Sequence, residues 1–233
     1  MNCPSMSKSA IDTYATFSTL IAVLLGALLT YFSTWFFERR KLRDKQRADA
    51  WGLFFTVQNM TNDILQLNML VRQSVKSAES HGLVGDNWTK ISDIGGFSKN
   101  EKHIATEQLV VLALTQNPEI MMGVLEIQSS HQIYIQLVSR LTALKEDLLK
   151  LQLPSAANGP VIGFKINIDQ YPKVAPYIVR LKDIGDALVS ELPKVALKAK
   201  DVAQKLGPHL KQFYKIERFG TISFSERAQR DLP

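Results

Sequence analysis

The chain has 233 residues, one cysteine and a formal charge of +6, a size that suits one ordinary domain with an appendage. The single cysteine, Cys3, excludes an intramolecular disulfide. Basic residues outnumber acidic ones six to three over 38–50 and ten to five over 171–218, whereas 51–170 carries nine basic and eleven acidic residues. Because no aromatic-interleaved basic motif accompanies this charge, nucleic acid is not an expected partner.

A short N-terminus, residues 1–12, precedes a long apolar segment, residues 13–37. The apolar segment contains no charged residue, and it exceeds the roughly 20 residues needed to cross about 30 Å of hydrocarbon. Tyr14 stands near its start and Trp35 near its end, where lipid headgroups would lie. A buried core helix is the alternative, but the length and the aromatic flanks favour a transmembrane helix.

Basic residues on the two flanks predict the orientation of this span. Lysine and arginine near a span are retained in the cytoplasm, which predicts an external N-terminus and a cytoplasmic C-terminal domain, in an inner or plasma membrane. A cleaved signal peptide would have its basic residues before a shorter apolar core, so the segment is predicted to remain as an anchor. Lys8 stands alone before the span, and the predicted membrane-interface residues are Trp35, Arg39, Arg40, Lys41, Arg43, Lys45 and Arg47.

Small residues recur at a spacing of four along one face of the span. This pattern lets two helix backbones approach closely in lipid, and it predicts a homo-oligomer. The alternative is that small residues are simply common in membrane spans. The predicted association residues are Ser18, Ala22, Gly26, Thr30 and Thr34.

Residues 38–78 are predicted to continue the same helix, because no proline occurs between Pro4 and Pro118. After a basic collar, residues 38–47, apolar residues recur at alternating steps of three and four, which indicates one apolar face. This amphipathic stretch is predicted to be a stalk or a member of a helical bundle. Its predicted packing residues are Phe54, Val57, Met60, Ile64, Leu67 and Val71.

Residues 79–100 contain four glycines and predict a loop, and residues 101–219 predict a helical bundle. Ser98-Lys-Asn-Glu101 has the form of a capping box and predicts a helix to about residue 116. Asn117-Pro118 then predicts the start of a helix to about 151. Gln128 and Gln132 interrupt the apolar face of that helix, either as polar contacts in the core or as part of a polar cleft.

The C-terminal third combines irregular and helical patterns. Residues 161–168 alternate in polarity and predict either a short strand or an extended loop over the bundle. Helices are predicted at 173–191, 194–206 and 208–218, followed by a tail over 220–233. The predicted fold class is therefore mainly α, with one N-terminal transmembrane helix that continues into a cytoplasmic helical bundle.

Signatures of enzymatic chemistry are sparse. The sequence contains no glycine-rich phosphate loop, no His-Glu-x-x-His and no Gly-x-Ser-x-Gly. His103 with Glu107, and His131 with Glu126, are close enough in sequence to share a metal or a proton, but a metal site needs three or four ligands. His209 is predicted at a helix start without a partner. No catalytic residue, metal or cofactor is therefore predicted, and a hydrolase or metal-dependent enzyme ranks third among the functions considered.

The leading functional hypothesis is a single-pass, membrane-anchored scaffold or signalling module. It would self-associate and bind a protein partner at the cytoplasmic face of the lipid bilayer. The alternative is a membrane-perturbing effector whose spans assemble when the cytoplasmic domain is triggered. In that case the polar seam would comprise Ser18, Thr30, Ser33 and Thr34.

Overall fold

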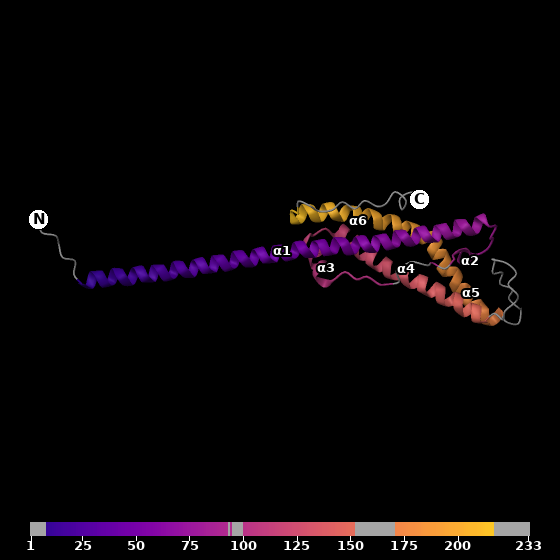
Figure 1. Cartoon of the computed structure of the whole chain (residues 1–233), viewed down its shortest axis with the longest axis horizontal. Helices are drawn as coiled ribbons and strands as arrows, with labels where there is room; N and C mark the ends of the chain where they lie inside the picture. The colour runs from indigo at the N-terminus through magenta and orange to yellow at the C-terminus, as the bar shows by residue number, and fades with distance from the viewer. Residues whose placement is uncertain (1–7, 93, 95–99, 152–170, 217–233) are drawn as a thin grey trace. The chain divides into compact units, whose positions relative to one another are not determined.

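The computed structural model describes residues 8–92, 94, 100–151 and 171–216, and within these ranges it contains helices and no strand. The predicted mainly α class is therefore confirmed. The strand predicted over 161–168 and the tail over 220–233 lie outside the described residues. In chain order (Figure 1) the elements are α1 (Lys8–Ser80), α2 (Asn87–Lys90), α3 (Thr106–Leu114), α4 (Pro118–Leu151), α5 (Tyr171–Asp186), the π-helical turn η2 (Ala187–Glu191) and α6 (Leu192–Tyr214).

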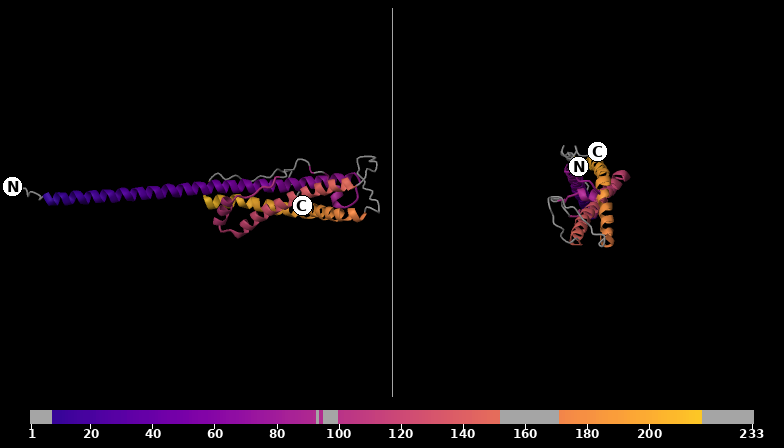
Figure 2. Two further views of the ribbon diagram at one scale, coloured as in Figure 1. Left: turned by 90° about the horizontal axis from the view of Figure 1, so that it is seen from below. Right: turned by 90° about the vertical axis from the view of Figure 1, so that its right-hand side faces the viewer.

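The chain divides into two compact units, unit 1 (Met1–Ala48) and unit 2 (Asp49–Pro233). Helix α1 belongs to both units, because it runs without interruption from Lys8 to Ser80. The predicted continuity of the N-terminal helix is thereby confirmed. In unit 2, α4, α5 and α6 gather along the C-terminal part of α1 (Figure 2).

The core of unit 2 includes the apolar face predicted for α1. Its six residues, from Phe54 to Val71, are at most 2% exposed. The same core cluster contains Val124 and Val138 of α4 and Leu206 of α6. Since these side chains already pack within one chain, this face of α1 is not available for association between chains.

Helix α3 begins later than predicted, at Thr106. Glu101, which the sequence assigns to a capping box, is not helical, and its carboxylate accepts a hydrogen bond from Gln136 of α4. The helix start is instead marked by Ala105, whose backbone is extended and whose N–H donates to Oε1 of Gln108 at 3.1 Å. A glutamine at the third helical position can satisfy an N-terminal amide without a polar cap residue.

Helix α6 also differs from prediction, because it continues through Pro208 instead of breaking there. A proline ring normally clashes with the Cβ of the preceding residue in a helix. Here the preceding residue is Gly207, which has no Cβ, so His209 lies inside α6 and not at a helix start. The helix predicted over 173–191 is present as α5 followed by the π-helical turn η2.

The predicted loop over 79–100 contains the short helix α2, which packs on α5. A Cβ on Gly185 of α5 would lie 2.5 Å from the backbone nitrogen of Trp88, so only glycine permits this approach. Asn87 Nδ2 donates to Asp186 Oδ1 at 2.8 Å, and Trp88 is 5% exposed. The centre of the segment 79–100 is therefore held against α5.

Candidate functional site

The apolar part of α1 in unit 1 is uncovered. Within the described residues, α1 is the one helix long and apolar enough to cross a membrane, and none of its most apolar stretch is buried. Phe17, Leu28 and Phe37 are 64%, 52% and 67% exposed. A helix in the core of a water-soluble protein would be mostly buried, whereas this one presents apolar side chains on every side.

The basic collar follows directly, and its six cationic residues are all exposed. The guanidinium of Arg39 lies 4.4 Å from the centroid of the Trp35 ring, a cation–π contact at the end of the apolar segment. Asp44 is 4.0 Å from Arg47. Because Glu38 and Asp44 are the only acidic residues over 38–48, the collar keeps a net positive charge.

The predicted association residues Ala22, Gly26, Thr30 and Thr34 are exposed, and the side chain of Ser18 lies outside the described part of the structure. Thr30 Oγ1 donates to the carbonyl oxygen of Gly26 at 2.8 Å. A Cβ on Gly26 would meet no atom within 4 Å. A larger side chain at this position would therefore cause no clash within a single chain.

Unit 2 contains a polar cluster that the sequence did not reveal. Asp63 Oδ2 of α1 accepts from Lys102 Nζ at 2.6 Å and from His131 Nε2 of α4 at 2.8 Å. Burial by itself would raise the pKa of Asp63, but the hydrogen bonds from His131 and Lys102 and their charge outweigh it, so the pKa lies below its usual value. The sequence offered one indication of this cluster, since Asp63 is the only charged residue over 50–71.

Neither of the two histidine–glutamate pairs considered from the sequence forms in the structure. Glu126 instead pairs with Lys198 at 2.6 Å, and His131, which is 1% exposed, binds Asp63. His103 precedes α3, so it is not one helical turn from Glu107; its Nδ1 lies 2.9 Å from Gln132 Nε2. Over the described residues, no three histidine, cysteine, aspartate or glutamate side chains are grouped to hold a metal ion.

Three glutamines of α4 hold residues 101–104, here called the strap. Gln128 Oε1 accepts from the N–H of Ile104 at 3.1 Å, and Gln136 Nε2 donates to Glu101 at 3.1 Å. Gln132 lies between them and contacts His103, so the three amides are spaced one helical turn apart. Gln128 and Gln132 are thus partly exposed contacts to the strap, and neither side chain lies in the core itself.

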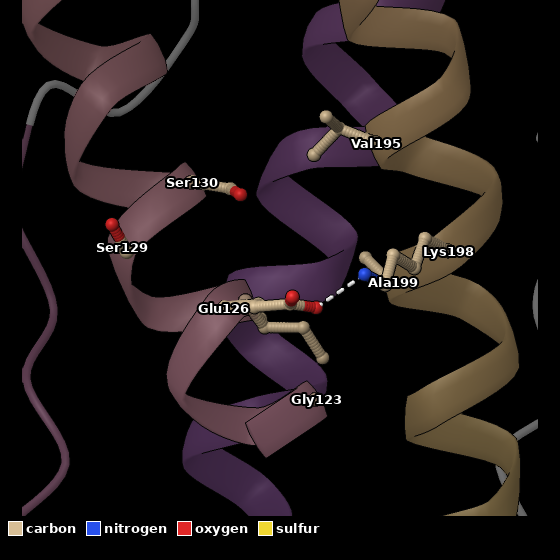
Figure 3. A pocket seen from close by; sticks show the side chains of 8 residues that line it. Gly123, Glu126, Ser129, Ser130, Val195, Lys198 and Ala199 are labelled. Atoms are coloured by element: carbon tan, nitrogen blue, oxygen red, sulfur yellow. Dashed lines mark ion pairs between the residues drawn. The ribbon is translucent and has the colours of Figure 1, made fainter. Parts of the chain in front are cut away.

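A groove of about 260 Å³ lies between α4 and α6. Figure 3 shows Glu126 and Lys198 reaching toward each other, with Ser130 directed toward the space between the two helices. Close by, a Cβ on Gly123 would lie 2.7 Å from Val202, which indicates tight helix packing. The groove offers one ion pair and hydroxyl groups. It is lined by Gly123, Glu126, Ile127, Ser129, Ser130, Val195, Lys198 and Ala199.

Tyr214 holds the C-terminal end of α6 against α3. Its hydroxyl donates to the carbonyl oxygen of Val111 in α3 at 2.7 Å. Burial, together with the negative charge of Asp49, raises the pKa of Tyr214 to about 12. Burial also lowers the pKa of His209 in the preceding turn.

Comparisons of the chain with models of protein families, with curated proteins and with solved structures found no match. The functional interpretation therefore depends on the residues and contacts described above.

Proposed function

We propose that the chain is a single-pass membrane protein anchored by residues 13–37, with unit 2 in the cytoplasm as an interaction module. The observation that carries the proposal is the fully exposed apolar stretch of α1. Burial of a leucine, valine or phenylalanine is worth about 1.5–3 kcal/mol. A whole segment of such side chains in water would be strongly unfavourable, and lipid hydrocarbon removes that cost.

The collar supports retention of the segment and its orientation. A signal-peptidase site needs small residues after the apolar core, whereas 38–47 is rich in charged side chains within a continuous helix. Each basic residue near an anionic membrane surface contributes about 1 kcal/mol of attraction. Six such residues after the span, against Lys8 before it, favour a cytoplasmic unit 2.

Self-association through Ala22, Gly26 and Thr30 is part of the proposal. The absence of any atom within 4 Å of a Cβ on Gly26 leaves room for a second helix to approach. The Thr30 hydroxyl already donates its hydrogen to the Gly26 carbonyl, so in a polar seam of the kind that a membrane-perturbing effector would require it could only accept hydrogen bonds. For a protein partner of unit 2, the half-exposed Val110, Leu114 and Met122 provide apolar contacts.

Reporter fusions test the anchor and its orientation. Alkaline phosphatase fused after Pro233 should be inactive, and a fluorescent protein fused there should fluoresce, because the C-terminus is proposed to be cytoplasmic. The same chain should remain in membranes washed with alkaline carbonate. Active phosphatase would reverse the topology, and release of the chain by carbonate would refute the anchor itself.

A further inference from the structure

Helix α1 has a second face in unit 2, on the side away from the core. Positions 55, 59, 62 and 66 follow one another at steps of four and three, so they share one side of the helix. All four side chains are exposed: Phe55, at 52%, Asn59, Asn62 and Gln66. In the part of the chain that the structure describes, the three amides have no hydrogen-bond partner. They are therefore available to a molecule outside the chain.

None of the four residues on this face is charged, and few charges lie near them along the helix. Over residues 50–71, which span about 33 Å as a helix, the only charged residue is Asp63. Its carboxylate is engaged by Lys102 and His131. The exposed surfaces of α4 and α6 contain, among others, Glu119, Glu126, Arg140, Lys194, Lys198 and Lys211.

We propose that the uncharged face, defined by Phe55, Asn59, Asn62 and Gln66, packs against the same face of a second copy in parallel orientation. The inference depends on the proposed membrane anchor, which aligns copies with one another. In a symmetric contact each residue meets its own counterpart or a near neighbour, so charged side chains would face like charges. Amides both donate and accept hydrogen bonds, and they can therefore pair with identical groups.

Phe55 supplies an apolar anchor for this contact. Its ring stacks on Trp51 with centroids 5.4 Å apart and an interplanar angle of 21°, so the exposed aromatic surface is held in place. Depletion of charge and enrichment of aromatic residues are typical of the centre of protein interfaces. Asparagines within a helix–helix seam also specify parallel register. An acidic or basic partner, or a layer of anionic headgroups, would find no opposite charge on this face.

Cysteine crosslinking of the full chain in native membranes tests the contact. In a Cys3→Ser background, Asn62→Cys and Gln66→Cys should give disulfide-linked dimers on mild oxidation, since a disulfide forms only when the two Cα atoms lie within about 7 Å. Gln204→Cys, at an exposed position on α6, is the matched control. We expect several-fold more dimer from position 62 than from position 204. Equal crosslinking at the two positions would overturn the proposal.

Carbonate extraction of the same membranes separates this inference from the anchor on which it rests. If the chain stays in the membrane but Asn62→Cys gives no dimer, the uncharged face is not an interface and the anchor still stands. If carbonate releases the chain, both proposals are wrong. As a second variant, Asn62→Glu places like charges across the contact and should lower dimer yield several-fold with unchanged circular dichroism, whereas Gln204→Glu should not.

Discussion

The two parts of α1 contain similar apolar residues in different arrangements around the helix axis. Residues 19–37 are apolar on all sides and are exposed. Over residues 50–71, apolar side chains recur at steps of three and four and are buried, while the opposite side is uncharged and carries three amides and Phe55. Apolar content alone therefore does not determine what covers a helix. The distribution of apolar residues around the axis does.

A single residue type makes the comparison concrete. Leu24 in unit 1 is 55% exposed, whereas Leu67 in unit 2 is 0% exposed. The chain itself provides the surroundings of Leu67, but a lipid bilayer would have to provide those of Leu24. Substitutions should therefore have different effects in the two parts of the same helix.

The largest expected effect comes from shortening a leucine in the core. Leu67→Ala should lower the free energy of unfolding of unit 2 by about 2–5 kcal/mol, because it removes buried apolar surface and leaves a cavity. Urea unfolding of the full chain in detergent, followed by circular dichroism, measures this loss. Leu24→Ala is the matched control and should leave the unfolding of unit 2 unchanged. Equal losses from both substitutions would mean that residue 24 is also packed by protein.

A smaller effect is expected from the polar cluster formed by Asp63, Lys102 and His131. Asp63→Asn should destabilise unit 2 by about 1–3 kcal/mol at neutral pH, because Lys102 and His131 lose a charged acceptor. The lowered pKa of Asp63 means that its contribution is present above the unfolded-state pKa and is lost as pH falls through the folded-state pKa. The difference between variant and parent should therefore disappear in acid.

Unfolding midpoints measured across a range of acidic pH check this behaviour. Asp147→Asn serves as the control, since Asp147 pairs with Lys150 at 3.1 Å on the surface and its side chain is 50% exposed. Such exposed pairs are worth little. If the Asp63 difference stayed constant down to strongly acidic pH, the carboxylate would not be the source of the stabilisation.

The sequence predicted the features that depend on local periodicity. The long α1 helix, its buried face from Phe54 to Val71 and the start of α4 at Pro118 all follow from spacing and from proline placement. These signals extend over a few turns of one helix, so they can be read without the rest of the fold. Membrane insertion and self-association remain predictions.

The sequence could not predict contacts between distant segments. Asp63, Lys102 and His131 are brought together by packing of α1, the strap and α4, and nothing in their spacing indicates a partnership. The prediction that a capping box ending at Glu101 opens the helix was wrong for a related reason. Glu101 bonds to Gln136 of α4 instead of capping its own helix. The conformation and partners of these residues depend on tertiary contacts, which local sequence patterns do not reveal.

The small-residue face of the span can be tested against the rest of its surface. Gly26→Ile should weaken self-association by about 1–2 kcal/mol, because a bulky side chain would prevent close approach of two helices in lipid. Leu24→Ile should have little effect. A membrane two-hybrid assay compares the two, with carbonate extraction confirming equal insertion. If Gly26→Ile associated as well as the parent, small residues would not form the contact, and crosslinking at position 62 would then identify the uncharged face as the interface.

The smallest expected effect comes from removing the hydroxyl of Tyr214, which joins α6 to α3. Tyr214→Phe should reduce the stability of unit 2 by about 0.5–1.5 kcal/mol, because the carbonyl of Val111 loses its hydrogen bond. Tyr177→Phe makes the same chemical change at a half-buried tyrosine of α5 and should cost less.

The dependence of this effect on alkaline pH distinguishes the hydrogen bond from simple packing. Because the folded-state pKa of Tyr214 is raised to about 12, the neutral phenol contributes stability below the unfolded value of about 10. That contribution is lost as pH rises through the folded pKa. The parent should therefore approach the stability of Tyr214→Phe in strong alkali, as measured by urea unfolding alongside tyrosinate absorbance. A difference that stayed constant through this pH range would contradict the raised pKa of Tyr214, because ionisation of the hydroxyl would then not weaken the folded state.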